Sequence, residues 1–131
     1  LSNSMPSCKV HRPTGDNRVA QGRRFEDLAA QFYQKNKFTI CERNWRAGAR
    51  EIDLIVRRDN LLVFVEVKSS QTPAFGHPAE WVDARKVAHL TAAARQYLVD
   101  KEITDCDLRF DLVTFSNGEM EFYPDAFMAA E

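Results

Sequence analysis

Hydrophobic residues recur every three or four positions in two stretches of the chain, which predicts two amphipathic helices. The first helix is expected from about residue 15 to residue 36, with Asp16 as a candidate N-cap. The second helix is expected over residues 81–99. The apolar face of the first helix would consist of Val19, Phe25, Leu28, Ala29 and Phe32. The apolar face of the second would consist of Val87, Leu90, Ala94, Tyr97 and Leu98.

Shorter runs rich in β-branched and aromatic residues predict five strands. They are expected at residues 38–41, 51–56, 61–68, 108–115 and 119–123. A tight turn at 57–60 would join the second and third strands into an antiparallel hairpin, and Asn117-Gly118 is a strong signal for another hairpin. Prolines and a glycine predict a mobile loop over residues 69–80. The order αβββαββ is typical of an α/β fold, in which helices flank a mixed β-sheet.

The length and composition fit one domain. The chain has 131 residues, of which 44% are hydrophobic, and we expect residues 15–131 to fold together behind a flexible tail at 1–14. Residues 1–4 precede the first methionine, and we expect them to be a cloning remnant. The sequence contains neither an apolar run of about 18 residues nor a signal-peptide core, so we expect a cytoplasmic protein without membrane partners.

The three cysteines have no spacing typical of a zinc site or of a disulfide framework. Cys8, Cys41 and Cys106 therefore fit a reducing, cytoplasmic setting. We expect Cys41 and Cys106 to be small core or strand residues.

The charges are unevenly distributed along the chain. Residues 1–58 contain 12 Lys or Arg against 6 Asp or Glu, whereas residues 59–131 contain 6 against 13. The net charge of −1 alone does not indicate a nucleic-acid partner. The asymmetry permits a basic face for phosphate contacts, although folding could also mix the charges again.

Two strands carry acidic residues in positions where a sheet is normally apolar. The third strand is apolar from residue 61 to 67 except for Glu66, so we expect it in the middle of the sheet, covered on both sides. Glu66 and Lys68 should share a face with Leu62 and Phe64, because strand side chains alternate. A carboxylate on that face is unfavourable unless another group compensates its charge.

The second strand repeats this anomaly. Glu51 and Asp53 are expected on one face, with the apolar side chains of Ile52, Leu54 and Val56 on the other. Counting from the turn places Asp53 opposite Glu66 to within two residues. The repulsion between the two carboxylates would be relieved by Mg²⁺, which takes few carboxylates and several waters. An ion-pair cluster, with Lys68 on Glu66 and an arginine on Asp53, is the alternative.

At these residues the sequence resembles a known group of enzymes. Glu51-Ile52-Asp53 followed by Glu66-Val67-Lys68 resembles the PD-(D/E)xK signature of restriction-endonuclease-like nucleases, with Ile52 in place of the proline. The wider chain resembles the YraN-like family of uncharacterised bacterial proteins and is similar to archaeal Holliday-junction resolvases. The segments that carry the YraN-like resemblance are 22–30, 51–55, 63–68 and 109–113.

The resemblance implies a metal-dependent endonuclease that hydrolyses phosphodiester bonds in DNA, including branched or damaged DNA. Asp53, Glu66 and the carbonyl of Val67 would bind Mg²⁺ or Mn²⁺, and Lys68 would position the attacking water or stabilise charge on phosphorus. Glu26 matches the accessory acid of the superfamily and could bind a second metal. Glu51 also matches the pattern, although a salt bridge with an arginine would explain it equally.

The remaining candidates concern partners. Phosphate contacts are expected from Arg23, Arg24, Arg43, Arg46, Arg50, Arg85 and Lys86. Trp45 could stack on a base or simply pack on the sheet. His77 and His89 have no identifiable partner, and the mechanism needs none. A homodimer is expected by analogy, and a partner protein could target the domain. The alternatives to an enzyme are a non-catalytic nucleic-acid-binding module and a structural protein with an ion-pair core.

Overall fold

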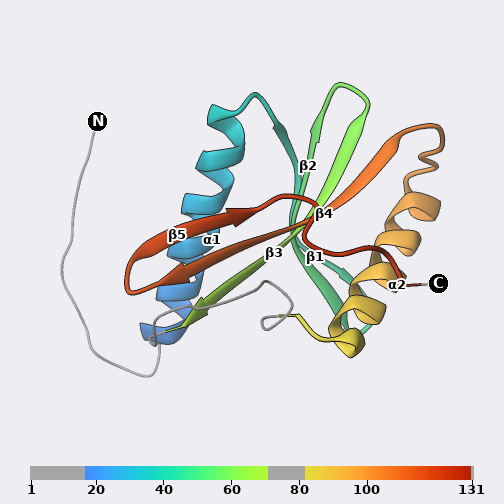
Figure 1. The fold of residues 1–131 in the computed structure, drawn as a ribbon. Helices are drawn as coiled ribbons and strands as arrows, with labels where there is room; N and C mark the ends of the chain where they lie inside the picture. The colour runs from blue at the N-terminus through green and yellow to red at the C-terminus, as the bar shows by residue number, and fades with distance from the viewer. Residues whose placement is uncertain (1–16, 71–81, 131) are drawn as a thin grey trace.

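The computed structural model describes residues 17–70 and 82–130, and it confirms the predicted element order αβββαββ. Figure 1 shows two helices on opposite sides of one β-sheet. The elements are α1 (Asn17–Lys35), β1 (Thr39–Ala47), β2 (Arg50–Arg58), β3 (Leu61–Ser70), α2 (Ala84–Asp100), β4 (Asp107–Ser116) and β5 (Glu119–Tyr123).

The five strands form one mixed sheet in the order β1-β2-β3-β4-β5. Three of the four pairings are antiparallel and join strands that follow each other in the chain. Two of them, β2 with β3 and β4 with β5, are the predicted hairpins. β3 and β4 are parallel, and the connection between them contains α2. A parallel pair needs such a crossover, because its two strands start at the same end of the sheet. β3 is therefore the central strand, as predicted.

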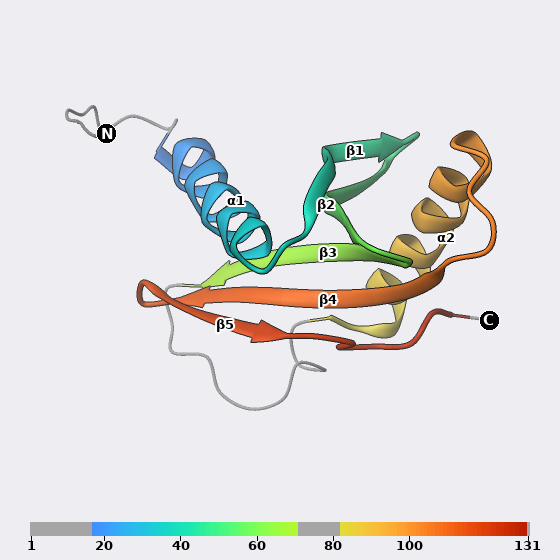
Figure 2. The same ribbon diagram turned by 90° about the horizontal axis from the view of Figure 1, so that it is seen from above.

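Each face of the sheet has its own buried core, and Figure 2 shows the helices that cover them. The α1 face is defined by the cluster of Ala29, Ala30, Tyr33, Phe38, Leu54, Val56, Val63, Val65, Val113 and Phe115. The α2 face is defined by the cluster of Ile52, Ile55, Leu62, Phe64, Leu90, Ala93, Ala94, Tyr97 and Phe110. Full burial of a large apolar side chain is worth about 1.5–3 kcal/mol, so the two clusters together stabilise the three layers.

One prediction about β2 is wrong: Ile52 does not share a face with Leu54 and Val56. Ile52 packs on the α2 face, whereas the other two pack on the α1 face. The β1–β2 register pairs Arg43 with Leu54 and Trp45 with Ile52, and it skips the step between these pairs. At that step Asn44 has a φ of 52°, a left-handed conformation that reverses the alternation of side chains.

Several predicted boundaries shift in the structure. β1 is longer than the predicted 38–41, because the strand continues through Asn44 to a turn at Gly48, whose φ is 64°. α2 begins after its N-cap Asp83, which accepts a hydrogen bond from the Lys86 N–H at 2.9 Å. Leu28 is 38% exposed and does not belong to the apolar face of α1, whereas Tyr33 is fully buried there.

Some predictions fall on residues that the structure does not describe. The tail at 1–14, the N-cap Asp16 and most of the loop at 69–80 lie outside the described residues, as do Cys8 and His77. Within the described part, Ser69 and Ser70 extend β3 rather than starting the predicted loop. No helix of this part is long and apolar enough to cross a membrane.

Candidate active site

Asp53 and Glu66 lie next to each other where β2 begins to separate from β3. The last register pair between the two strands is Leu54 with Val65, directly before these two acids. In place of a further strand pairing, the Val67 N–H donates a hydrogen bond to Asp53 Oδ2 at 2.8 Å. The side chain of Asp53 is therefore held by the backbone of the strand that carries Glu66. This agrees with the prediction that Asp53 lies opposite Glu66 to within two residues.

The electrostatic environment of Asp53 disfavours its charged form. Burial is the main cause that raises the pKa of Asp53, followed by the nearby charge of Glu66, with smaller contributions from Glu26 and Glu51. The hydrogen bond from Val67 acts in the opposite direction and is weaker than these combined effects. A cation at this position would favour the ionised carboxylate, because it would offset both the loss of hydration and the repulsion.

Glu66 is buried, with 4% of its side chain exposed, and two lysines accompany it. Lys68 Nζ lies 3.5 Å from Glu66 Oε2, and Lys86 Nζ lies 3.2 Å from the same oxygen. Glu66 and Lys68 are on the α2 face, continuing the row of Leu62 and Phe64 as predicted. The pair of Lys68 with Glu66 also fits the ion-pair alternative. That alternative also expects an arginine on Asp53. Among the described residues no arginine pairs with Asp53, which instead accepts a hydrogen bond from the Val67 N–H.

A second pair of acids approaches Asp53 from the side of α1. Asn44 Nδ2 donates to Glu26 Oε2 at 3.2 Å and to Glu51 Oε2 at 3.1 Å, so one amide joins α1 to β2. Arg46 also pairs with Glu51 at 3.2 Å, as the salt-bridge explanation of Glu51 required. Sequence reasoning missed Asn44. Its one available signal was the tolerance of asparagine for left-handed conformations inside a β-rich segment.

The donor set fits a divalent cation that keeps several waters. In the described ranges, no group of three or more His, Cys, Asp or Glu side chains is placed to hold a metal ion. Two of the predicted ligands, the carboxylates of Asp53 and Glu66, are neighbours in the structure, and the sequence prediction adds the Val67 carbonyl. One or two carboxylates with waters completing the shell is the usual arrangement for Mg²⁺.

The residues predicted to contact nucleic acid are dispersed over the molecule. Arg43 pairs with Asp27 of α1 at 2.6 Å, and the Trp45 ring contacts Tyr97 edge-on at 5.2 Å. Trp45 is half-buried against the α2 face, which fits packing on the sheet. Lys86 lies beside Glu66, with 38% of its side chain exposed. Among these predicted contacts, Arg23, Arg24, Arg50 and Arg85 are exposed and have no ion pair in the described part.

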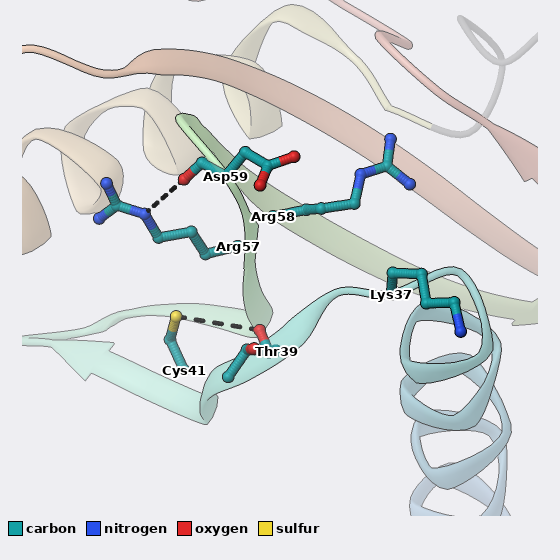
Figure 3. A pocket seen from close by; sticks show the side chains of 6 residues that line it. All are labelled: Lys37, Thr39, Cys41, Arg57, Arg58 and Asp59. Carbon is teal, nitrogen blue, oxygen red and sulfur yellow. Dashed lines mark hydrogen bonds between the residues drawn. The ribbon is translucent and has the colours of Figure 1, made fainter.

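A basic pocket lies at the opposite end of β2 and was not predicted. Its volume is about 650 Å³, and Figure 3 shows the six residues that line it: Lys37, Thr39, Cys41, Arg57, Arg58 and Asp59. The side chains of Arg57 and Arg58 extend in opposite directions, so their guanidinium groups do not converge on one ligand position. Partial loss of hydration raises the pKa of the Cys41 thiol, which keeps this largely exposed group protonated at neutral pH. Asp53 and Glu66 do not line this pocket.

The segment at 109–113 contains a buried carboxylate that joins β4 to α1. Asp111 is fully buried and accepts hydrogen bonds from Tyr33 Oη at 2.7 Å and from Arg109 Nε at 2.7 Å. The Asp125 N–H donates to the same carboxylate at 2.9 Å. The network attaches α1, which carries Glu26, to β4. It is a buried charge with its partners supplied, as stability requires.

The two remaining cysteines of the described part are free. Cys41 lies on β1 and is exposed, whereas Cys106 is half-buried and packs against the α2 face just before β4. His89 is exposed on α2.

Comparison with known proteins identifies the family of the chain. The model of the uncharacterised protein family UPF0102 matches residues 25–115. A UPF0102 protein of Chloroherpeton thalassium is 43% identical over 95 residues, which cover 72% of this chain and 74% of the relative. A UPF0102 protein of Dechloromonas aromatica is 39% identical over 114 residues, covering 87% and 93%. One of Flavobacterium psychrophilum is 36% identical over 106 residues, covering 78% and 88%. The YraN-like resemblance is thus confirmed, and the chain belongs to the uncharacterised protein family UPF0102.

Proposed function

We propose that this protein is a metal-dependent phosphodiesterase that cleaves nucleic acid, with DNA as the expected substrate. The observation that carries the proposal is the arrangement of side chains where the pairing of β2 with β3 ends. There Asp53 is held by the Val67 N–H, its pKa is raised by burial and by Glu66, and Lys68 stands beside Glu66. Strongly perturbed carboxylates with a specific charged neighbour are typical of functional sites.

The residues of the site have separate tasks in this proposal. Asp53, Glu66 and the Val67 carbonyl would hold Mg²⁺ or Mn²⁺, which when bound would polarise the scissile phosphate and lower the pKa of a water. Lys68 would stabilise the negative charge that develops on the phosphate oxygens, because its side chain lies beside Glu66 and is 36% exposed. The Val67 N–H orients Asp53, so that little rearrangement is needed on binding.

Glu26 and Glu51 would adjust the site from the α1 face. Both share the Asn44 amide, and both disfavour ionisation of Asp53. Their negative charges would strengthen the binding of a cation at Asp53, and Glu26 could hold a second metal. The exposed arginines on α1 and near the start of β2 would contact the substrate backbone. A cytoplasmic location, a homodimer and a targeting partner remain part of the proposal.

The proposal is tested with purified protein and labelled single-stranded, duplex, flap and four-way-junction DNA, together with RNA. Each substrate is incubated with Mg²⁺, with Mn²⁺ and with chelator, beside the variants Asp53→Ala and Lys68→Ala. We expect cleavage that requires the metal and is reduced at least 100-fold in both variants, a loss of about 2.7 kcal/mol in transition-state stabilisation. A matched control is Lys35→Ala, which removes an exposed charge from the last turn of α1 that has no ion pair in the described part.

Absence of cleavage on every substrate would contradict the enzymatic proposal. If binding that weakens with salt were retained, the fold would serve as a nucleic-acid-binding module. The two lysines on the buried Glu66 favour this second candidate, because they neutralise that carboxylate without a metal.

A further inference from the structure

We propose that Lys86, like Lys68, takes part in the function of the acid site, which is the site formed by Asp53 and Glu66. Its ammonium group occupies the place beside Glu66 until a divalent cation binds there, and it then contacts a phosphate group of the nucleic acid. The inference rests on the proposed metal-dependent function and adds to it a cation-exchange step between α2 and β3. Lys86 lies outside the Asp53, Glu66 and Lys68 set that the signature resemblance supplies.

The first observation is that Lys86 and Lys68 converge on one oxygen from two different elements. Glu66 Oε2 lies 3.2 Å from Lys86 Nζ and 3.5 Å from Lys68 Nζ, so the helix lysine is the nearer of the two. Both lysine side chains retain more than a third of their exposure, whereas Glu66 retains 4%. The ammonium groups therefore stand between the buried carboxylate and solvent, where a substrate would arrive.

The second observation concerns competition for the same oxygen. A buried carboxylate needs a cationic or hydrogen-bonding partner, and in the metal-free chain the lysines supply it. A divalent cation bound by Asp53 and Glu66 would take over that role and would repel both ammonium groups. Lysine is a compact charge on a flexible four-carbon stem, so Lys86 can turn toward an anion without movement of α2.

The third observation is the unusual charge of the first turn of α2. This turn contains Arg85 and Lys86 and has no acidic residue, so among the described residues the N-cap Asp83 is the one carboxylate at this end of α2 itself. Cations are unfavourable near the positive end of the helix dipole, and an anion there is favourable. Glu66 compensates Lys86 in the metal-free chain. A phosphate group would compensate both basic residues in the complex, and Arg85 has no ion pair among the described residues.

The same face carries one more polar group with spare bonding capacity. Thr114 pairs with Lys68 in the parallel register of β3 and β4. Its hydroxyl is buried and has no hydrogen-bond partner in the described part of the chain. Val113 and Phe115 pack on the α1 face, so alternation places Thr114 on the α2 face with Glu66 and Lys68. Polar atoms beyond the ion pairs thus border the place where the exchange would occur.

The test compares Lys86→Met with Lys35→Met, which removes an exposed lysine from the last turn of α1. Melting temperature is measured during an Mg²⁺ titration without nucleic acid. Because Lys86 competes with the metal, we expect the midpoint of the titration to fall about threefold to tenfold in Lys86→Met, and to stay unchanged in the control. Lys86→Gln keeps a hydrogen-bond donor for Glu66 and gives the same readout should the methionine variant not fold.

A second readout follows the phosphate contact. Binding to a phosphorothioate-protected DNA duplex is measured at several salt concentrations in the presence of Mg²⁺. Removal of one phosphate contact should lower the slope of log K against log salt by about 1. Lys86→Arg should keep the native slope, since it keeps the positive charge.

A purely structural Lys86 would give a different pattern. The variants would then melt at lower temperature, but the Mg²⁺ midpoint would stay or rise and the salt slope would not change, which would overturn the inference. If Mg²⁺ stabilised the native chain but bound the variant no more tightly, the exchange step alone would fail. If Mg²⁺ stabilised neither protein, the proposed metal site itself would fail and the inference with it.

Discussion

At the scale of single residues, Asp53 combines a raised pKa with a fixed orientation. Burial and the charge of Glu66 disfavour its ionised form, while the Val67 N–H holds one oxygen at 2.8 Å. Groups whose pKa is shifted by burial and by a specific neighbour are candidates for function, and here the two causes act on a side chain that the Val67 N–H holds by one oxygen. The unfavourable environment of Asp53 consequently lowers the folding stability of the metal-free chain.

The raised pKa predicts an unusual pH dependence of stability. In the unfolded chain Asp53 ionises near pH 4, whereas in the folded chain it keeps its proton to higher pH. Between about pH 4 and pH 8 the folded state therefore binds more protons than the unfolded state. The free energy of unfolding should thus fall as the pH rises through this interval. Urea unfolding in chelator at several pH values measures the effect.

The matched variant for this prediction is Asp53→Asn, which keeps the shape of the side chain and removes the titrating group. Its free energy of unfolding should depend less on pH and should exceed that of the native chain at the alkaline end. A pH dependence that is the same in both proteins would show that Asp53 does not titrate as inferred.

At the scale of elements, the site depends on a local reversal in two neighbouring strands. Asn44 adopts a left-handed conformation in β1, and the register skips the step at Asn44 and Asp53. Side chains before and after this step therefore point to opposite faces. The reversal lets Trp45 and Ile52 pack under α2, while Arg43 and Leu54 face α1.

This geometry predicts opposite tolerances at position 44. Asn44→Gly should change the free energy of unfolding by less than about 1 kcal/mol, because glycine accepts a positive φ. Asn44→Val should lower it by about 2 kcal/mol or more, since a β-branched residue is strained there. Chemical denaturation of the two variants checks the difference. Equal stability of the glycine and valine variants would contradict the left-handed conformation.

The attachment of α1 to β4 gives a further prediction at this scale. Asp111→Ala removes the buried carboxylate and leaves Arg109 and Tyr33 without their shared partner. We expect a loss of about 3–5 kcal/mol in unfolding free energy. Tyr33→Phe removes only one hydrogen bond of the network and should lower the unfolding free energy by about 1–2 kcal/mol. Comparable losses in the two variants would argue against a central role for the carboxylate.

At the scale of the whole molecule, the sheet separates two cores and brings distant segments to one place. Asp53 and Glu66 come from neighbouring strands, Lys86 from the helix on one face, and Glu26 from the helix on the other. Asp53 and Glu66 lie where the pairing of β2 with β3 ends.

The sequence alone predicted most of the elements, because their hydrophobic periods differ clearly. It also predicted the nearness of Asp53 and Glu66, since a short turn sets the register of a hairpin. The reversal at Asn44 was not predicted, because asparagine only tolerates a left-handed conformation and its presence in a strand does not require one. The ion pair of Lys86 with Glu66 depends on how α2 docks against the sheet, which is a non-local property that spacing along the chain does not encode.

The most direct test of the central claim is the melting temperature of the native chain and of Asp53→Asn, in chelator and in millimolar Mg²⁺ or Mn²⁺. We predict that the metals raise the melting temperature of the native chain, because a ligand at about 100 times its Kd stabilises a fold by about 2.7 kcal/mol. The rise should disappear in Asp53→Asn, whose melting temperature in chelator should be at least that of the native chain. A native melting temperature that ignores both metals, or a rise that persists in Asp53→Asn, would contradict the assignment of Asp53 and Glu66 as a metal site.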